Sequence, residues 1–261
     1  MIVPAVRSPG LSARVGLARG DITPKPGIYA RWGGSNHDTA ETIHRPLQAT
    51  VLTLRPRVKQ TLPLVLVDLD LGWWRDRAEP ERLAGRLRDA FGLPRENLLV
   101  SLSHTHSGPV LSRDFQDRPG GAECGPYLDR LAETAVELVR KALGNECPSI
   151  ITWGHGSCRL AVNRDFLEPG NGRYLCGFAP GMPADDTLLV GRITGPAGEI
   201  RGVIVNYACH PTTLGPENRA ISPDYVGALR ETVEHHCGGH CLFLLGACGE
   251  LAPAEQYSAD P

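Results

Sequence analysis

The 261-residue chain lacks several features that would restrict its class. No segment approaches the roughly 18 consecutive apolar residues of a membrane-spanning helix, so we expect no transmembrane segment. Residues 1–20 contain no apolar run of a secretory signal, which favours a cytoplasmic location. Lysine and arginine number 27 against 29 aspartate and glutamate, so the basic excess of a nucleic-acid-binding protein is missing.

Cysteine is present, but not in a pattern with an evident chemical role. The eight cysteines include no CxxC pair, and their density is too low for a disulfide framework. Free buried thiols are therefore expected. Cys209 and Cys248 are alternative nucleophiles, although only His210 lies beside either of them as a base. The segment HHCGGHC (235–241) has residue types suited to zinc, but the end of a helix capped by glycine explains it better.

Apolar runs alternate with helical patterns along most of the chain, without internal repeats or linkers. Residues 1–48 are rich in glycine, proline and arginine, and we expect them to form an irregular covering arm. The apolar runs predict strands, in which Val65, Leu99, Val205 and Phe243 should be buried. The predicted strands are 49–55, 63–71, 97–103, 149–158, 187–194, 200–208 and 241–247, and the predicted helices are 79–91, 126–143 and 223–236. Together they indicate a single α/β domain, a mixed β-sheet sandwich flanked by helices.

Three polar segments follow three of these strands, namely residues 103–109, 207–213 and 246–253. Ligands in open α/β sheets bind beyond the carboxyl ends of strands, so these segments would share a crevice if the strands run the same way. His104 and His106 are two residues apart, a spacing that can place both imidazoles on one face for a metal such as zinc. A pair of loop histidines bonded to the backbone is the alternative. Arg164 would, by itself, be a surface arginine paired with Asp165.

Taken together, these segments resemble the N-terminal catalytic domain of the neutral/alkaline (non-lysosomal) ceramidase family. The segment HTHSGP (104–109) is identical to the most specific family motif, and GLARGDITP (16–24) resembles the opening segment of the family. VDLDLG (67–72), the pair Asn163-Arg164, residues 206–211 and 221–227, and GELAP (249–253) match further family segments in the same order.

The resemblance implies a zinc-dependent amide hydrolase of sphingolipid metabolism that cleaves N-acylsphingosine or a related lipid or small-molecule amide through a zinc-bound water. By resemblance, His104 and His210 are zinc ligands and should converge although 106 residues separate them. His106 and Arg164 would then bind the oxygen of the scissile carbonyl, where negative charge develops.

The sequence departs from the family in two ways. The remaining family zinc ligands, a glutamate and a tyrosine, are expected beyond this chain, so that the C-terminal part of the catalytic domain is missing. Glu250, Glu255 and Tyr257 do not sit in matching motifs. Ala252 stands where the family has an active-site serine, and Glu250 where it has an aspartate. A non-catalytic relative that retains the fold and binds a metal or lipid is therefore the alternative function.

Overall fold

The computed structural model describes residues 10–32, 34–57 and 61–259. Its centre is an eight-stranded sheet in the order β13-β11-β10-β6-β1-β3-β4-β5. The pairs β11/β13 and β4/β5 are parallel, and the other neighbouring strands are antiparallel. The strands are β1 (Leu11–Asp21), β3 (Gln48–Pro56), β4 (Leu64–Leu69), β5 (Leu98–Leu102), β6 (Cys147–Ser157), β10 (Thr187–Thr194), β11 (Ile200–Tyr207) and β13 (His240–Leu245).

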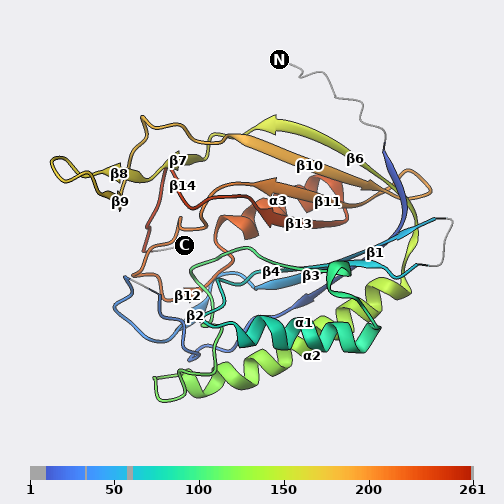
Figure 1. Cartoon of the computed structure of the whole chain (residues 1–261), viewed down its shortest axis with the longest axis horizontal. Coiled ribbons are helices and arrows are strands. Elements are labelled where there is room, and N and C mark those ends of the chain that lie inside the picture. Colours follow the sequence, from blue (N-terminus) through green and yellow to red (C-terminus); the bar gives the residue numbers. More distant parts are fainter. Residues whose placement is uncertain (1–9, 33, 58–60, 260–261) are drawn as a thin grey trace.

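The sheet curls so that its two ends approach each other. Strands β6, β10, β11 and β13 form one half, and β1, β3, β4 and β5 the other (Figure 1). Apolar side chains from both halves, including Val15, Leu52 and Ile204, pack between them. The predicted mixed α/β sandwich is therefore confirmed, with one curled sheet supplying both β-layers.

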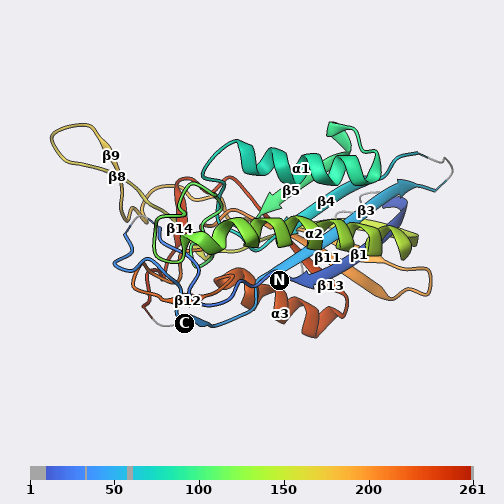
Figure 2. The same ribbon diagram turned by 90° about the horizontal axis from the view of Figure 1, so that it is seen from below.

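Helices cover both halves of the sheet. Helices α1 (Ala78–Phe91) and α2 (Cys124–Gly144) lie beneath the half that contains β3 and β4, as the view from below shows (Figure 2). The apolar face of α2 is buried throughout, from Leu128 to Ala142. Helix α3 (Tyr225–Cys237) packs on β11 and β13. None of the helices in the described part of the chain is long and apolar enough to cross a membrane.

Short strands gather at one end of the sheet. They form three pairs: β2 (Thr42–Ile43) with β12 (Ala220–Ile221), β7 (Ala161–Asn163) with β14 (Leu251–Pro253), and β8 (Asp165–Leu167) with β9 (Tyr174–Cys176). Two 3₁₀ turns, Arg95–Asn97 and Gly121–Glu123, precede β5 and α2. The loops that carry the predicted site residues cross this same end.

Two sequence predictions are wrong. Residues 1–48 are not an irregular arm throughout, because Leu11–Asp21 forms β1 in the middle of the sheet; residues 1–9 lie outside the described part. Leu99 is 55% exposed, whereas Val65, Val205 and Phe243 are buried as expected. Strand β5 lies at the edge of the sheet, and its alternate residues Leu98, Val100 and Leu102 face the helices. Leu99 therefore faces the other side, which is open at this edge.

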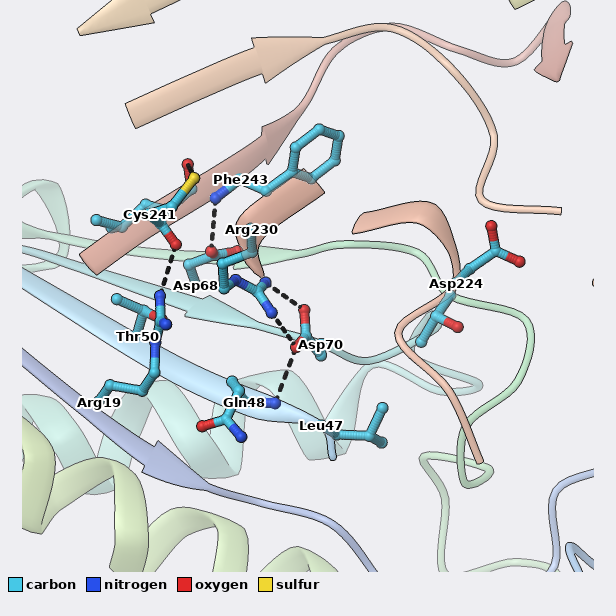
Figure 3. A network of polar contacts seen from close by, with 12 residues as sticks. Arg19, Leu47, Gln48, Thr50, Asp68, Asp70, Asp224, Arg230, Cys241 and Phe243 are labelled. Atoms are coloured by element: carbon cyan, nitrogen blue, oxygen red, sulfur yellow. Dashed lines mark hydrogen bonds and ion pairs between the residues drawn. The ribbon is translucent and has the colours of Figure 1, made fainter. Parts of the chain in front are cut away.

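A buried polar network joins the two halves of the sheet (Figure 3). Arg230 of α3 donates to both carboxylate oxygens of Asp70, just beyond β4, at 2.6 Å each. Asp68 of β4 accepts the backbone N–H of Phe243 in β13 at 2.9 Å. Arg19 of β1 donates to the Cys241 carbonyl oxygen at 2.7 Å. These contacts hold β4 and β1 against β13 and α3.

The ion pair between Asp70 and Arg230 allows a stability test. Both side chains are almost fully buried, so replacing one partner leaves an uncompensated charge. We expect Arg230→Met to lower the free energy of unfolding by about 3–5 kcal/mol, measured by urea denaturation. Arg45→Met breaks the more exposed pair with Glu231 and should cost less than about 1 kcal/mol. Equal losses of unfolding free energy in the two variants would show that the buried pair contributes no more to stability than the exposed one.

Asp68 gives the network a pH dependence. Burial, only partly offset by Arg230, raises the pKa of the Asp68 carboxyl to about 7. A carboxyl whose pKa is raised on folding favours the folded state most below its unfolded pKa of about 4, and that contribution is lost as the pH rises through about 7. Asp68→Asn removes this titration, so the stability of the wild type should fall relative to the variant between pH 4 and 7. Parallel stability curves would contradict the raised pKa.

Candidate functional site

The site is built where loops from both halves of the sheet meet. His104 and His106 follow β5, His210 follows β11, and Arg164 lies between β7 and β8. Strands β11 and β13 run parallel, so the polar segments after them lie at the same edge of the sheet, as predicted. Strand β5, which precedes His104, lies in the other half beside β4. The curl of the sheet brings these loops together. His104 Nε2 lies 3.1 Å from His210 Nε2, and the ligating nitrogens of His104, His106 and His210 all lie within 4.8 Å of one another.

The loop that carries His104 and His106 is held by hydrogen bonds to two other segments of the chain. The backbone N–H of His104 donates to the Leu71 carbonyl oxygen at 2.8 Å, and His104 adopts a positive φ of 68°, a strained conformation for a residue other than glycine. The buried Thr105 hydroxyl then donates to the Ser222 carbonyl oxygen at 2.6 Å. The central threonine of the motif thus ties this loop to the segment that leads into α3.

The hydrogen bonds of His210 and His104 orient their free nitrogens. His210 Nδ1 lies 2.7 Å from the Cys248 carbonyl oxygen, and His104 Nδ1 lies 3.3 Å from that of Gly72. A carbonyl oxygen only accepts, so each Nδ1 carries the proton and each Nε2 presents a lone pair. Two lone pairs therefore face each other across 3.1 Å, an arrangement that a shared cation would stabilise.

His106 is enclosed by rings and lacks a hydrogen-bond partner. Its ring centroid lies 4.5 Å from that of Trp32, 4.8 Å from Trp73 and 5.0 Å from His104. Both of its ring nitrogens are buried and unpaired within the described part of the chain. Burial, reinforced by the neighbouring histidines and arginines, lowers the pKa of His106 to about 2, so its imidazole is neutral. A buried unpaired imidazole in a ligand crevice is free to bond to a substrate or a metal.

Arg164 reaches into this cluster from the opposite loop. Its Nη2 donates to His210 Nε2 at 3.2 Å, and its Nε donates to the Gly249 carbonyl oxygen at 3.0 Å. No ion pair with Asp165 forms among the described residues, so the alternative of a surface pair is not what the structure shows. Tyr257, which has a positive φ of 63°, also places its hydroxyl beside the Arg164 guanidinium.

The competing chemical sites are not assembled. Among the described residues, His104, His106 and His210 are the one group of three histidine, cysteine or acidic side chains close enough to hold a metal ion. His236 is instead bonded to the Thr232 carbonyl oxygen within α3. Burial raises the pKa of the Cys209 and Cys248 thiols to about 12 and about 11, so neither is a ready nucleophile at neutral pH.

The sequence reasoning missed the aromatic and cationic side of the site. Trp73 and Arg75 follow β4, and Trp32 comes from the N-terminal segment, yet they line one hollow with His106. A signal existed for two of them, because Trp73 and Arg75 come directly after the apolar segment 63–71, as the polar segments follow the other strands. Ala252, by contrast, is fully buried in β14 opposite Val162 of β7.

This curled mixed sheet is the fold of ceramidases of known structure. The chain superposes on a ceramidase complexed with C2 with a TM-score of 0.72 and 24% identity, covering 93% of this chain and 39% of that one. It superposes on the neutral ceramidase from Pseudomonas aeruginosa with a TM-score of 0.74 and 24% identity, covering 93% of this chain and 40% of that one. No family model matches the sequence.

The sequences themselves are also related. The chain is 26% identical to the neutral ceramidase of Pseudomonas aeruginosa over 265 residues, which cover 95% of this chain and 38% of that protein. The resemblance predicted from the motifs is confirmed, and the chain is a homologue of neutral ceramidase that spans about two fifths of its length.

Proposed function

We propose that this chain forms part of a zinc-dependent hydrolase that cleaves an N-acyl amide, as the ceramidase homology implies. The observation that carries the proposal is the convergence of His104 and His210 from separate halves of the sheet, with Arg164 donating to the same nitrogen of His210. The named activity of the relative supports hydrolysis of an N-acylsphingosine or a related lipid amide.

The residues present fit a zinc ion. Two ligand nitrogens bound to tetrahedral zinc at about 2.0–2.1 Å lie about 3.3 Å apart, close to the 3.1 Å between His104 Nε2 and His210 Nε2. The Nδ1–H group of each residue also donates a hydrogen bond to a backbone carbonyl oxygen, the usual support of a metal-binding histidine. His104 and His210 would therefore hold the ion. When bound, zinc supplies a Lewis acid that lowers the pKa of water to about 7.

Arg164 and His106 supply the groups that the carbonyl oxygen of an amide requires. Negative charge develops on that oxygen during attack, and hydrogen-bond donors already in place stabilise it. Arg164 is held by the Gly249 carbonyl oxygen, and its backbone N–H donates to the Glu250 carbonyl oxygen at 2.8 Å. The neutral His106 carries one N–H with no protein acceptor, so it can donate to the substrate.

Ala252 separates this chain from the family pattern and favours the second candidate function. It offers no hydroxyl where the family has a serine, and its side chain is fully buried. A non-catalytic relative would bind the metal or an amide without hydrolysing it. The two functions are distinguished by turnover, because they share the same ligands.

Zinc uptake tests the metal site. We expect the purified protein to bind one zinc ion, measured by isothermal titration calorimetry, and His210→Ala to abolish stoichiometric binding because a ligand is removed. His236→Ala is the matched control, because His236 lies at the exposed end of α3 and should not affect binding. Zinc binding that is absent in the wild type, or unchanged in His210→Ala, would exclude the site.

Arg164→Ala tests the role of the guanidinium. We expect kcat for an N-acyl amide to fall by roughly 10²–10³-fold, as the loss of one donor to a developing oxyanion typically causes. Zinc uptake should be unchanged, because arginine cannot ligate a metal. Arg173→Ala, an exposed arginine paired with Glu168, serves as the control.

The substrate panel runs from short N-acyl amino acids to ceramides. Full activity of Arg164→Ala on whichever amide is cleaved would refute the assigned role. If the zinc-loaded wild type cleaves no amide of the panel, the non-catalytic function is the correct one.

A further inference from the structure

A second arginine without a carboxylate partner borders the site. Arg75 lines the hollow that also contains His106, Trp32 and Trp73. Its guanidinium carbon lies 4.5 Å from the centroid of the Trp73 ring, which also lies 4.8 Å from the His106 ring and 5.3 Å from the His104 ring. Arg75 Nη2 donates to the Arg31 carbonyl oxygen at 3.3 Å. Stacking on the indole fixes the plane of the guanidinium and leaves its remaining N–H groups free to bind a ligand.

The acidic groups near Arg75 are engaged elsewhere. The adjacent Asp76 accepts the backbone N–H groups of Ala78 and Glu79 and the Ser112 hydroxyl, so its carboxylate is committed to the start of α1. Asp38 pairs with Arg31 at 3.0 Å. Within the described ranges, neither Arg75 nor Arg164 has a carboxylate within 4.0 Å. The described part of the site therefore presents two guanidinium groups without a protein counter-ion.

We propose that Arg75 binds a negatively charged group of the substrate, so that the site takes an anionic N-acyl amide, of which an N-acyl amino acid is the simplest. This inference rests on the proposed amide hydrolase function. In an N-acylglycine, the carboxylate carbon lies within about 5 Å of the scissile carbonyl carbon. His106, assigned to that carbonyl, and Arg75 both lie against the Trp73 ring and line one hollow, so a substrate that reaches one of them lies close to the other.

The amine half of a ceramide would bind the Arg75 guanidinium no more strongly than water does. This half is a neutral amino alcohol, whereas a carboxylate accepts two N–H bonds from one guanidinium.

Two substrates that differ only in charge test the proposal. N-octanoylglycine and N-octanoylethanolamine share the acyl chain and the amide, and differ in a carboxylate against a hydroxymethyl group. We expect the wild type to hydrolyse N-octanoylglycine with a kcat/KM about tenfold higher, since a charged hydrogen bond is worth about that factor. Arg75→Gln should remove this preference by lowering the kcat/KM for N-octanoylglycine to that for N-octanoylethanolamine. Arg77→Gln, an exposed arginine two residues away, should change neither.

Binding provides a readout that does not depend on turnover. N-octanoylglycine added to the chelator-treated, metal-free protein should quench tryptophan fluorescence at Trp73, and Arg75→Gln should weaken the apparent affinity about tenfold. Equal hydrolysis of both amides, or a preference that survives Arg75→Gln, would overturn the inference while the amide hydrolase function stands. If no amide is cleaved, the hydrolase function fails, and binding alone decides: weaker binding in Arg75→Gln supports the anion site, and equal binding refutes it.

Discussion

The ion pair between Asp70 and Arg230 sets the relation between the two halves of the curled sheet. Asp70 lies at the end of β4, one residue before Leu71, whose carbonyl oxygen accepts the N–H of His104. Arg230 lies in α3, whose N-cap Asp224 accepts the backbone N–H groups of Thr213 and Leu214 in the loop after His210. The pair therefore anchors the segments that lead to His104 and to His210. A buried pair of this kind costs free energy to desolvate, which geometry must offset with good hydrogen bonds. Its two contacts of 2.6 Å provide them.

Local pattern predicted most elements of the fold, and its failures have physical causes. The segment 187–194 is observed as β10 with the same bounds, since it is an apolar run next to the turn 195–199. Strand β1 was missed because Arg14, Gly16 and Arg19 interrupt it, although Ala13, Val15 and Leu17 alternate on its buried side. In the folded chain, Arg19 is satisfied across the sheet by Thr50, Glu234 and the Cys241 carbonyl oxygen. Those partners lie up to 222 residues away, so no local pattern could reveal them.

The family resemblance predicted the site residues and the convergence of His104 and His210, whereas local sequence pattern alone predicted only the residue types. The motif at 104–109 marked His104 and His106, and only the family resemblance singled out His210 and Arg164. The spatial contact between His104 and His210 depends on the curl of the whole sheet, which strand patterns do not encode. The same curl places Trp73 and Arg75 beside His106. A search for polar residues after the predicted strand 63–71 would have found these two residues, but not the stacking between them.

The position of the histidines at the seam between the two halves couples ligand occupancy to folding. A ligand bound by both His104 and His210 links the two halves of the curled sheet, because separating the halves must break one of its two bonds. Its binding free energy is then added to the free energy of unfolding, in proportion to the logarithm of ligand concentration over the dissociation constant. Resistance to unfolding in this chain would therefore be a sensitive reporter of site occupancy, even for a ligand that is never turned over.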